Sequence, residues 1–149
     1  MKIPASLDGA LGFNITRVAL LFRRELIEAL RGYHLTPEQW QILVAIIETE
    51  QIVHQSTLSD LTLKDTPNIS RILKRMERDG WIERAVDVDD ARSKRVIATS
   101  YAREAYPDIR ATLEAHFDAR LRPVAEETEQ LMRLLHRLRG CFEADPLLS

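Results

Sequence analysis

The sequence predicts a mainly α-helical protein with one small β-hairpin, and three observations lead to this fold class. Apolar residues recur at three- and four-residue steps over most of the 149 residues, as in helices that bury one face. A short basic helix is expected to begin at Thr66 and Pro67, and another short helix precedes it. Two extended segments, 81–86 and 95–99, follow it and flank an acidic loop. This order predicts a winged helix-turn-helix between long N- and C-terminal helices.

The composition is that of an ordinary globular protein. Hydrophobic residues make up 45% of the chain and charged residues 30%, so a core can form without disulfides or metals. The longest apolar stretches, such as residues 18–22, are too short to span a bilayer, and the N-terminus lacks the apolar core of a signal peptide. We therefore expect a cytoplasmic protein with no membrane segment. The net charge of −2 argues against a protein that coats nucleic acid through bulk charge.

The first three helices are predicted from their apolar stripes and start signals. The first covers residues 7–33, with Gly32 weakening its last turn. The second begins after Thr36, whose hydroxyl can cap it, with Pro37 at the first helical position. The third covers approximately residues 54–62. It forms a helix-turn-helix with the basic helix that follows it.

The basic helix has one apolar and one polar side. We expect Thr66 to be its N-cap and Pro67 its first residue, and the helix ends at Asp79 and Gly80. One side gathers Ile69, Ile72, Leu73 and Met76, and the other gathers Asn68, Ser70, Arg71, Lys74, Arg75 and Arg78. The first side can pack on a core while the second meets phosphates and base edges in a DNA major groove.

The last part of the chain is predicted to be helical after the wing. Thr99 or Ser100 caps a helix that reaches residue 122, in which Pro107 should cause a bend or a restart. Pro123 breaks it, and a last helix covers residues 124–140 and ends at Gly140. The resulting domain organisation is an N-terminal dimerisation helix (1–33), a winged helix-turn-helix (34–99) and C-terminal dimerisation helices (100–149).

The terminal helices carry more apolar surface than a small winged domain can cover. A symmetric homodimer is the commonest arrangement that buries such surface, and it places two copies of the basic helix side by side. The predicted partners are thus a second copy of the chain and a double-stranded DNA operator.

The two ends of the basic helix are expected to contact different parts of the DNA. Recognition helices insert their N-terminal end deepest, so Asn68, Ser70 and Arg71 are chosen for base-edge contacts. Lys74 and Arg75 are chosen for phosphate contacts, and Thr66 and Pro67 complete the candidate recognition set. The alternative is a solvated surface with intrahelical ion pairs, such as one between Arg75 and Asp79.

Two stretches of the sequence resemble the multiple antibiotic resistance regulator (MarR) family. Residues 70–84 are similar to the family's recognition helix, with the sequence SRILKRMERDGWIER. Residues 89–99, DDARSKRVIAT, are similar to its wing, whose signature is Asp-x-Arg followed by Leu-Thr. Asp90, Arg92 and Thr99 match this signature, and Ala98 replaces the leucine. The resemblance covers nearly the whole chain and implies a dimeric winged helix-turn-helix protein that binds a palindromic operator.

The resemblance also implies roles in the wing. Arg92 would enter the minor groove, whose negative potential attracts a guanidinium, and Asp90 would orient it. Lys94 and Arg95 complete the candidate wing set. Asp87 and Asp89 make this wing more acidic than is usual in the family, so we expect the wing to bind DNA more weakly.

Other functional groups are expected to be few. His34 and Trp40 are candidates for a pocket that takes a small aromatic effector, as relatives do, although core packing is the default for Trp40. The four histidines lack the i,i+4 spacing of metal ligands on a helix, so no metal and no cofactor are predicted. Oxidant-sensing cysteines of the family lie in the first helix, whereas the single cysteine here is Cys141, which we expect to be unreactive.

The sequence therefore predicts a DNA-binding transcriptional regulator, more specifically a homodimeric repressor. It has no Gly-rich phosphate loop and no nucleophile elbow, so an enzyme is not expected. Two alternatives stay open: a winged-helix protein-interaction module that has lost DNA binding, and a ligand-binding or carrier protein.

Overall fold

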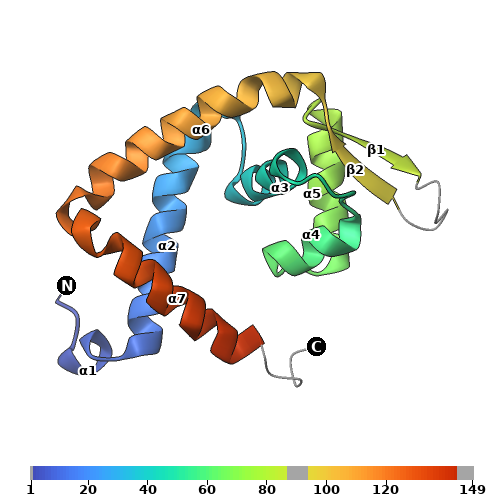
Figure 1. Cartoon of the computed structure of the whole chain (residues 1–149). Helices are drawn as coiled ribbons and strands as arrows, with labels where there is room; N and C mark the ends of the chain where they lie inside the picture. The colour runs from blue at the N-terminus through green and yellow to red at the C-terminus, as the bar shows by residue number, and fades with distance from the viewer. Residues whose placement is uncertain (1, 87–93, 144–149) are drawn as a thin grey trace. The chain divides into compact units, whose positions relative to one another are not determined.

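The computed structural model describes residues 2–86 and 94–143, which form two compact units, Met1–Leu113 and Glu114–Ser149 (Figure 1). The first unit contains α1 (Ala5–Asp8), α2 (Leu11–Leu30), a 3-10 turn η1 (Arg31–Tyr33), α3 (Pro37–Glu48), α4 (Gln55–Thr62), α5 (Thr66–Arg78), β1 (Ile82–Val86), β2 (Lys94–Ala98) and the first part of α6 (Ser100–Leu121). The second contains the end of α6, the 3-10 segment η2 (Arg122–Glu127) and α7 (Thr128–Glu143). The predicted mainly α-helical fold with a small β-hairpin is confirmed.

The N-terminal segment is not the single helix predicted for residues 7–33. The chain leaves the helical conformation at Ala10, where φ is −88° and ψ is 118°. Because glycine is a weak helix former, Gly9 lowers the free-energy cost of this break. The side-chain amide of Asn14 also stabilises it by donating to the carbonyls of Asp8 (2.7 Å) and Ala10 (3.0 Å). After Leu30 the helix tightens into η1 and ends at His34, whose φ is 57°.

The start of α3 is as predicted. The Thr36 hydroxyl accepts a hydrogen bond from the Gln39 backbone N–H (3.2 Å), and the Gln39 side chain accepts one from the Thr36 N–H (2.8 Å). This capping box satisfies two backbone donors, with Pro37 in the first turn. The loop between α3 and α4 is held against β2 by a backbone hydrogen bond, in which the Val96 N–H donates to the Val53 carbonyl at 2.9 Å.

The cap of α5 differs from the prediction by one residue. Asp65, not Thr66, is the N-cap, and its Oδ1 accepts from the Asn68 backbone N–H at 2.8 Å. Thr66 is the first helical residue, so Pro67 occupies the second position rather than the first. Asp and Thr have similar cap preferences, and proline fits either position of the first turn, so the sequence alone did not separate the two registers.

The wing is a two-stranded antiparallel sheet in which Ile82 faces Ala98, Arg84 faces Val96, and Val86 faces Lys94. It follows α5 directly, since Gly80 takes a φ of 81° and the Trp81 N–H donates to the Met76 carbonyl at 2.9 Å. The positive φ explains why glycine is favoured at this turn. Residues 87–93, which connect the strands, lie outside the described residues.

One hydrophobic core holds the first unit together. Its members come from the end of α2, from α3, α4 and α5, from both strands and from α6, and those with no exposed surface are Leu30, Ile42, Leu43, Leu58, Ile69, Leu73, Met76, Ala102 and Ile109. In Figure 1, the strands β1 and β2 lie beside α5. The exposed side of α5 is thereby fixed, because its opposite side is fully buried.

The helix α6 begins at the Thr99 cap, whose hydroxyl accepts from the Ala102 N–H at 3.1 Å. It does not restart at Pro107 but continues to Leu121. Buried Tyr106 and Ile109 flank the proline, and their packing offsets the hydrogen bond that a proline removes from a helix.

In the second unit, the predicted break near Pro123 is confirmed by η2 and by Val124, whose φ of −123° is not helical. The last helix does not cover residues 124–140 as predicted. It begins four residues later and continues through Gly140, because a single glycine lowers helix stability without ending the helix. Among the described residues, no helix is long and apolar enough to cross a membrane.

Candidate nucleic-acid interface

The outward side of α5 is a cationic surface. Ile69, Leu73 and Met76 are buried, and the opposite side exposes arginines and a lysine. Four of these basic residues line a surface hollow of about 530 Å³: Arg71, Lys74, Arg75 and Arg78. A concentration of one charge sign in a concave surface strengthens the local potential and attracts polyanions.

The N-terminal half of this surface keeps its positive charge unneutralised. Within the described part of the chain, neither Arg71 nor Lys74 forms an ion pair with a carboxylate. Arg71 instead donates to the Asn68 side-chain oxygen at 2.6 Å. Asn68 and Ser70 are half-buried, while Thr66 and Pro67 are exposed at the same helix end. The structure thus brings Asn68 and Arg71 into direct contact, whereas Ser70 lies on the other flank of the exposed side.

The C-terminal half is partly neutralised. Arg78 donates to the Asp79 carboxylate at 2.8 Å, and the predicted pair of Arg75 and Asp79 is present at a longer 3.8 Å. The hydrogen bond from Arg78 holds the pKa of Asp79 below its usual value. Exposed pairs of this kind contribute little to stability and leave the guanidinium groups available to phosphates.

The described part of β2 adds one exposed and one half-buried cation. Lys94 is exposed at the start of β2. Arg95 is half-buried beside His54, and its buried Nε has no hydrogen-bond partner among the described residues. Asp90 and Arg92, the other two predicted wing residues, lie outside the described residues.

An ion pair between Arg84 and Glu77, which the sequence did not reveal, anchors the wing to α5. The Arg84 side chain from β1 is 15% exposed and donates to the Glu77 carboxylate at 2.6 Å. This hydrogen bond is the main cause that lowers the pKa of Glu77. Glu77 is therefore committed to the wing and does not neutralise the basic side of α5.

Neither His34 nor Trp40 lines either of the two pockets described below. His34 is exposed at the end of η1, whereas Trp40 is half-buried, packs on the core and stacks on Tyr106 with ring centroids 5.2 Å apart. The default prediction of core packing for Trp40 is confirmed.

A pocket of about 440 Å³ lies between α2, α3 and the α4–α5 turn, where sequence reasoning did not place one. Phe22 and Leu26 supply apolar surface, and Arg23 pairs with Glu38 at 2.9 Å. Burial alone would raise the pKa of Glu38, but the hydrogen bond from Arg23 and the charges of Arg23 and Lys64 lower it overall. The pocket therefore combines an aromatic wall with positive charge.

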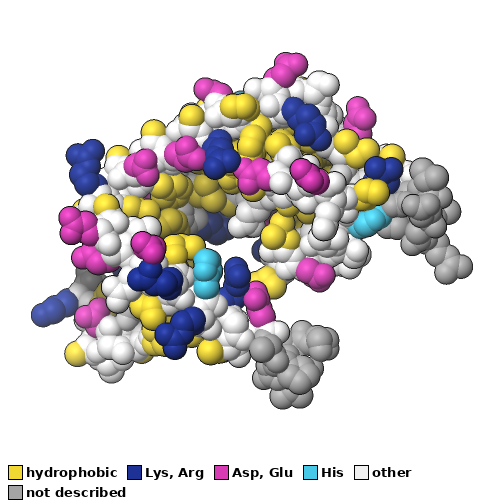
Figure 2. Space-filling view, viewed as in Figure 1, with side chains coloured by type: hydrophobic (Ala, Val, Ile, Leu, Met, Phe, Trp, Pro, Cys, Tyr) yellow, Lys and Arg dark blue, Asp and Glu magenta, His cyan; other side chains and the backbone are white. Residues whose placement is uncertain are grey.

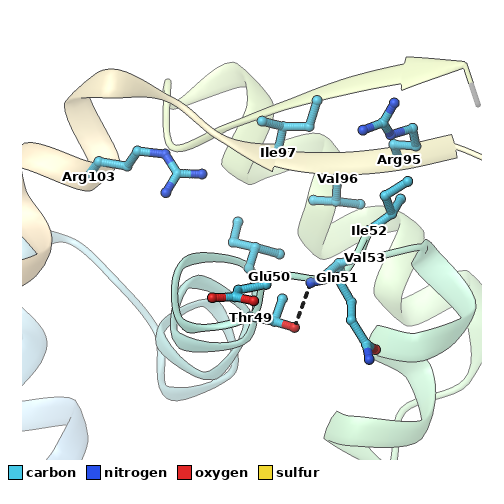
Figure 3. Close-up of a pocket in the computed structure, with 10 residues that line it drawn as sticks. Thr49, Glu50, Gln51, Ile52, Val53, Arg95, Val96, Ile97 and Arg103 are labelled. Carbon is cyan, nitrogen blue, oxygen red and sulfur yellow. Dashed lines mark hydrogen bonds between the residues drawn. The ribbon is translucent and has the colours of Figure 1, made fainter.

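A smaller pocket of about 230 Å³ lies where the α3–α4 loop meets β2 and the start of α6 (Figure 3). Arg103 and Glu50 lie toward one end of it and Arg95 toward the other. The Gln51 N–H donates to the Thr49 hydroxyl at 3.2 Å and shapes the loop. This smaller pocket shares no lining residue with the larger one.

Polar contacts also fasten α6 to the rest of the first unit. Tyr106 and Arg110 both donate to Glu48 at the end of α3, at 2.5 and 2.6 Å. Tyr33 donates to the Asp108 carboxylate at 2.7 Å. These residues are far apart in sequence and no local pattern predicted their pairing.

Comparison with known proteins gives consistent matches. The model of the MarR family matches residues 33–93. An uncharacterised HTH-type transcriptional regulator of Bacillus subtilis, YybA, is 30% identical over 112 residues, which are 74% of each chain. A probable transcriptional regulator from Pseudomonas aeruginosa has a TM-score of 0.79 at 30% identity, covering 89% of this chain and 98% of that one.

The transcriptional repressor CouR is similar in fold. Its structure bound to a 23-mer DNA duplex has a TM-score of 0.85 at 18% identity and covers 93% of this chain and 99% of its own. CouR from Rhodococcus jostii RHA1 bound to p-coumaroyl-CoA has a TM-score of 0.78 at 21% identity, covering 93% and 95%. At these identities, the likeness concerns the fold.

Proposed function

The chain belongs to the MarR family of transcriptional regulators, and we propose that it acts as a homodimeric repressor on a palindromic DNA operator in the cytoplasm. Family and fold make it a winged-helix regulator and not an enzyme. The observation that carries the proposal is the exposed basic side of α5, where Arg71 and Lys74 have no carboxylate partner among the described residues.

In the proposed complex, α5 of each subunit lies in a major groove. Half-sites would lie about 10 base pairs apart, one helical turn. Asn68, Ser70 and Arg71 face base edges, and Lys74 and Arg75 face phosphates. The wing residues Asp90, Arg92, Lys94 and Arg95 serve the adjacent minor groove, with Arg92 as the inserted side chain.

The proposed homodimer uses the apolar sides of the terminal helices. On α2, the exposed residues of one side include Leu11, Val18 and Phe22, which are 66%, 52% and 43% exposed. On α7, Leu131 and Leu134 are 50% and 52% exposed. Figure 2 shows hydrophobic side chains at the surface among the charged ones. A second copy of the chain would remove this surface from water, which is the main gain in such interfaces.

We also propose an aromatic effector, by analogy with the p-coumaroyl-CoA bound by CouR. The pocket between α2 and α3 suits such a ligand better than the surroundings of His34 and Trp40, since it offers Phe22 and Leu26 beside Arg23 and Lys64. An effector seated there would contact both a dimerisation helix and the winged domain, and its binding would have to be coupled reciprocally to DNA binding.

Selection of bound fragments from random DNA, followed by gel-shift titration of the selected operator, tests the proposal. We expect Arg71→Ala to relax sequence preference, with about 1 to 3 kcal/mol lost if it makes a bidentate base contact. The matched control is Arg31→Ala, an exposed arginine outside α5 that pairs with Glu28. Binding should fall log-linearly with salt. A chain that selects no sequence and shows no such salt dependence would instead be a protein-interaction module.

A further inference from the structure

The first turn of α5 contains a chain of three hydrogen bonds that uses both oxygens of one carboxylate. Asp65 Oδ1 accepts from the Asn68 backbone N–H at 2.8 Å, and Asp65 Oδ2 accepts from the Asn68 side-chain Nδ2 at 2.9 Å. Asn68 Oδ1 in turn accepts from Arg71 Nη2 at 2.6 Å. One carboxylate therefore caps the helix and also starts a relay that ends on an exposed guanidinium.

The chemistry of the groups gives this relay a direction. An ionised carboxylate only accepts hydrogen bonds, so the Asn68 NH₂ group must face Asp65. The amide oxygen of Asn68 is then left facing Arg71, which only donates. The opposite orientation of the amide would place two acceptors together at Asp65 and two donors together at Arg71. Asp65 therefore determines that Asn68 turns its amide oxygen, and not its NH₂ group, toward Arg71.

The relay also determines where Arg71 points. Arg71 Nε makes a longer contact with the Pro67 carbonyl at 3.4 Å, so both contacts draw its head group toward the N-terminal end of α5. That is the end of a recognition helix that approaches base edges. Among the described residues, the remaining guanidinium donors have no partner, and the side chain is exposed, as a bidentate contact with guanine requires.

We propose that Asp65 is a positioning residue for base recognition, which orders Arg71 through the Asn68 amide. The inference rests on the proposed function, in which α5 contacts DNA. Asp65 contributes no base contact of its own. Its negative charge lies at the helix end that meets DNA, so it weakens sequence-independent attraction to phosphates while it fixes the side chain that distinguishes bases.

Two substitutions separate positioning from capping and from charge. Asp65→Asn and Asp65→Ser remove the same charge, and each keeps an oxygen that can cap the Asn68 N–H with similar strength. Asp65→Asn, however, puts an NH₂ group where Oδ2 was. This reverses the Asn68 amide and turns its NH₂ group toward Arg71. Asp65→Ser leaves the Asn68 amide without a partner on that side, and therefore free to keep accepting from Arg71.

The experiment measures the affinity of the full chain for the selected operator and for operators with one base pair changed, over a salt series. The base pair contacted by Arg71 is the one at which Arg71→Ala loses discrimination. We expect both Asp65 variants to bind non-specific DNA more tightly to the same extent. At that base pair, Asp65→Asn should lose about tenfold or more of the discrimination, and Asp65→Ser should lose less.

A double-mutant comparison completes the test. In an Arg71→Ala background, Asp65→Asn should cause no further loss of discrimination at that base pair, because the guanidinium that Asn68 orders is absent. Equal discrimination by the unsubstituted chain and both Asp65 variants would overturn the positioning role, as would a loss that persists without Arg71. If the unsubstituted chain binds no operator, the proposed function itself is contradicted.

Discussion

The phenol of Tyr106 donates a hydrogen bond to the carboxylate of Glu48 over 2.5 Å and so joins α6 to the end of α3. Arg110 donates to the same oxygen at 2.6 Å, and Trp40 stacks on the tyrosine ring. The helix that leads out of the winged domain is thus fixed to the helix-turn-helix by polar contacts as well as by the core. A displacement of α3 would have to break them.

Replacing Tyr106 with Phe should lower stability. The substitution keeps the ring stacked on Trp40 but removes the hydroxyl that donates to Glu48. Hydrogen bonds to charged groups contribute modestly, so we expect a loss of about 1 to 2 kcal/mol in the free energy of unfolding. Urea titration followed by circular dichroism measures it. An unchanged midpoint would mean that the Arg110 contact with Glu48 is sufficient by itself.

The same tyrosine predicts a stability change in alkaline solution. Burial, and next the hydrogen bond with Glu48, raise the pKa of Tyr106 from 10.0 to about 12. A pKa raised in the folded state adds stability that is complete below pH 10 and is lost as the pH rises through about 12. Unfolding free energies measured from pH 9 to 12 should therefore fall more steeply for the unsubstituted chain than for Tyr106→Phe. Parallel curves would contradict this assignment. The pKa of Tyr33 is raised as well, but Tyr33 is present in both proteins and therefore does not contribute to the difference between their curves.

Lys74→Ala should weaken binding without changing sequence preference. Lys74 is exposed on the basic side of α5 and has no ion-pair partner among the described residues. A lysine that contacts one phosphate releases about one counterion, so the slope of log affinity against log salt should fall in magnitude by about 1. Fluorescence anisotropy with the selected operator and with unrelated DNA measures both slopes. A loss confined to the operator would identify Lys74 as a base-contacting residue.

Arg92→Ala should lower operator affinity and leave folding and dimerisation intact. The family resemblance assigns this arginine to the minor groove, where a narrow A·T-rich segment concentrates negative potential. Gel-shift titration measures the affinity, and size-exclusion chromatography with light scattering checks the assembly. Arg31→Ala again serves as the control for the loss of one exposed arginine. If the two variants bind alike, the wing assignment fails.

Polar substitution on α7 should dissociate the proposed dimer. Leu131 and Leu135 lie on one side of α7 and are 50% and 41% exposed in the single chain. Replacing both with Gln should yield monomers at micromolar concentration, because the apolar surface that drives association is lost. The matched control replaces Arg133 and Arg137 with Gln on the opposite side of the helix. Dimers of equal stability in both proteins would place the interface elsewhere.

Much of the fold follows from local sequence patterns. The stripe of Ile69, Leu73 and Met76 fixes which side of α5 is buried, and the wing strands were predicted within one residue. The candidate site was predictable for the same reason, since the residues opposite a buried stripe must be exposed. The division of the chain into dimerisation and DNA-binding parts stays a prediction, as do the individual DNA contacts.

Helix boundaries were less predictable where two neighbouring residues had similar preferences. Asp65 and Thr66 can each cap a helix, and the structure chooses Asp65, whose second oxygen also accepts from Asn68. Gly9 and Gly140 are the same residue type in helical surroundings, yet the first lies at a break and the second lies within α7. Propensities of a few tenths to about one kcal/mol do not decide such cases without their tertiary context.

The sequence by itself determined the helical and strand periods, the basic side of α5 and the family resemblance, because these depend on residues close together along the chain. Only the tertiary structure decided that Glu48 meets Tyr106 and Arg110, that Arg84 withdraws Glu77 from the basic surface, and that a pocket opens between α2 and α3. Such contacts join residues that are distant in sequence. Their geometry is fixed by how the elements pack around one core, which no local pattern encodes.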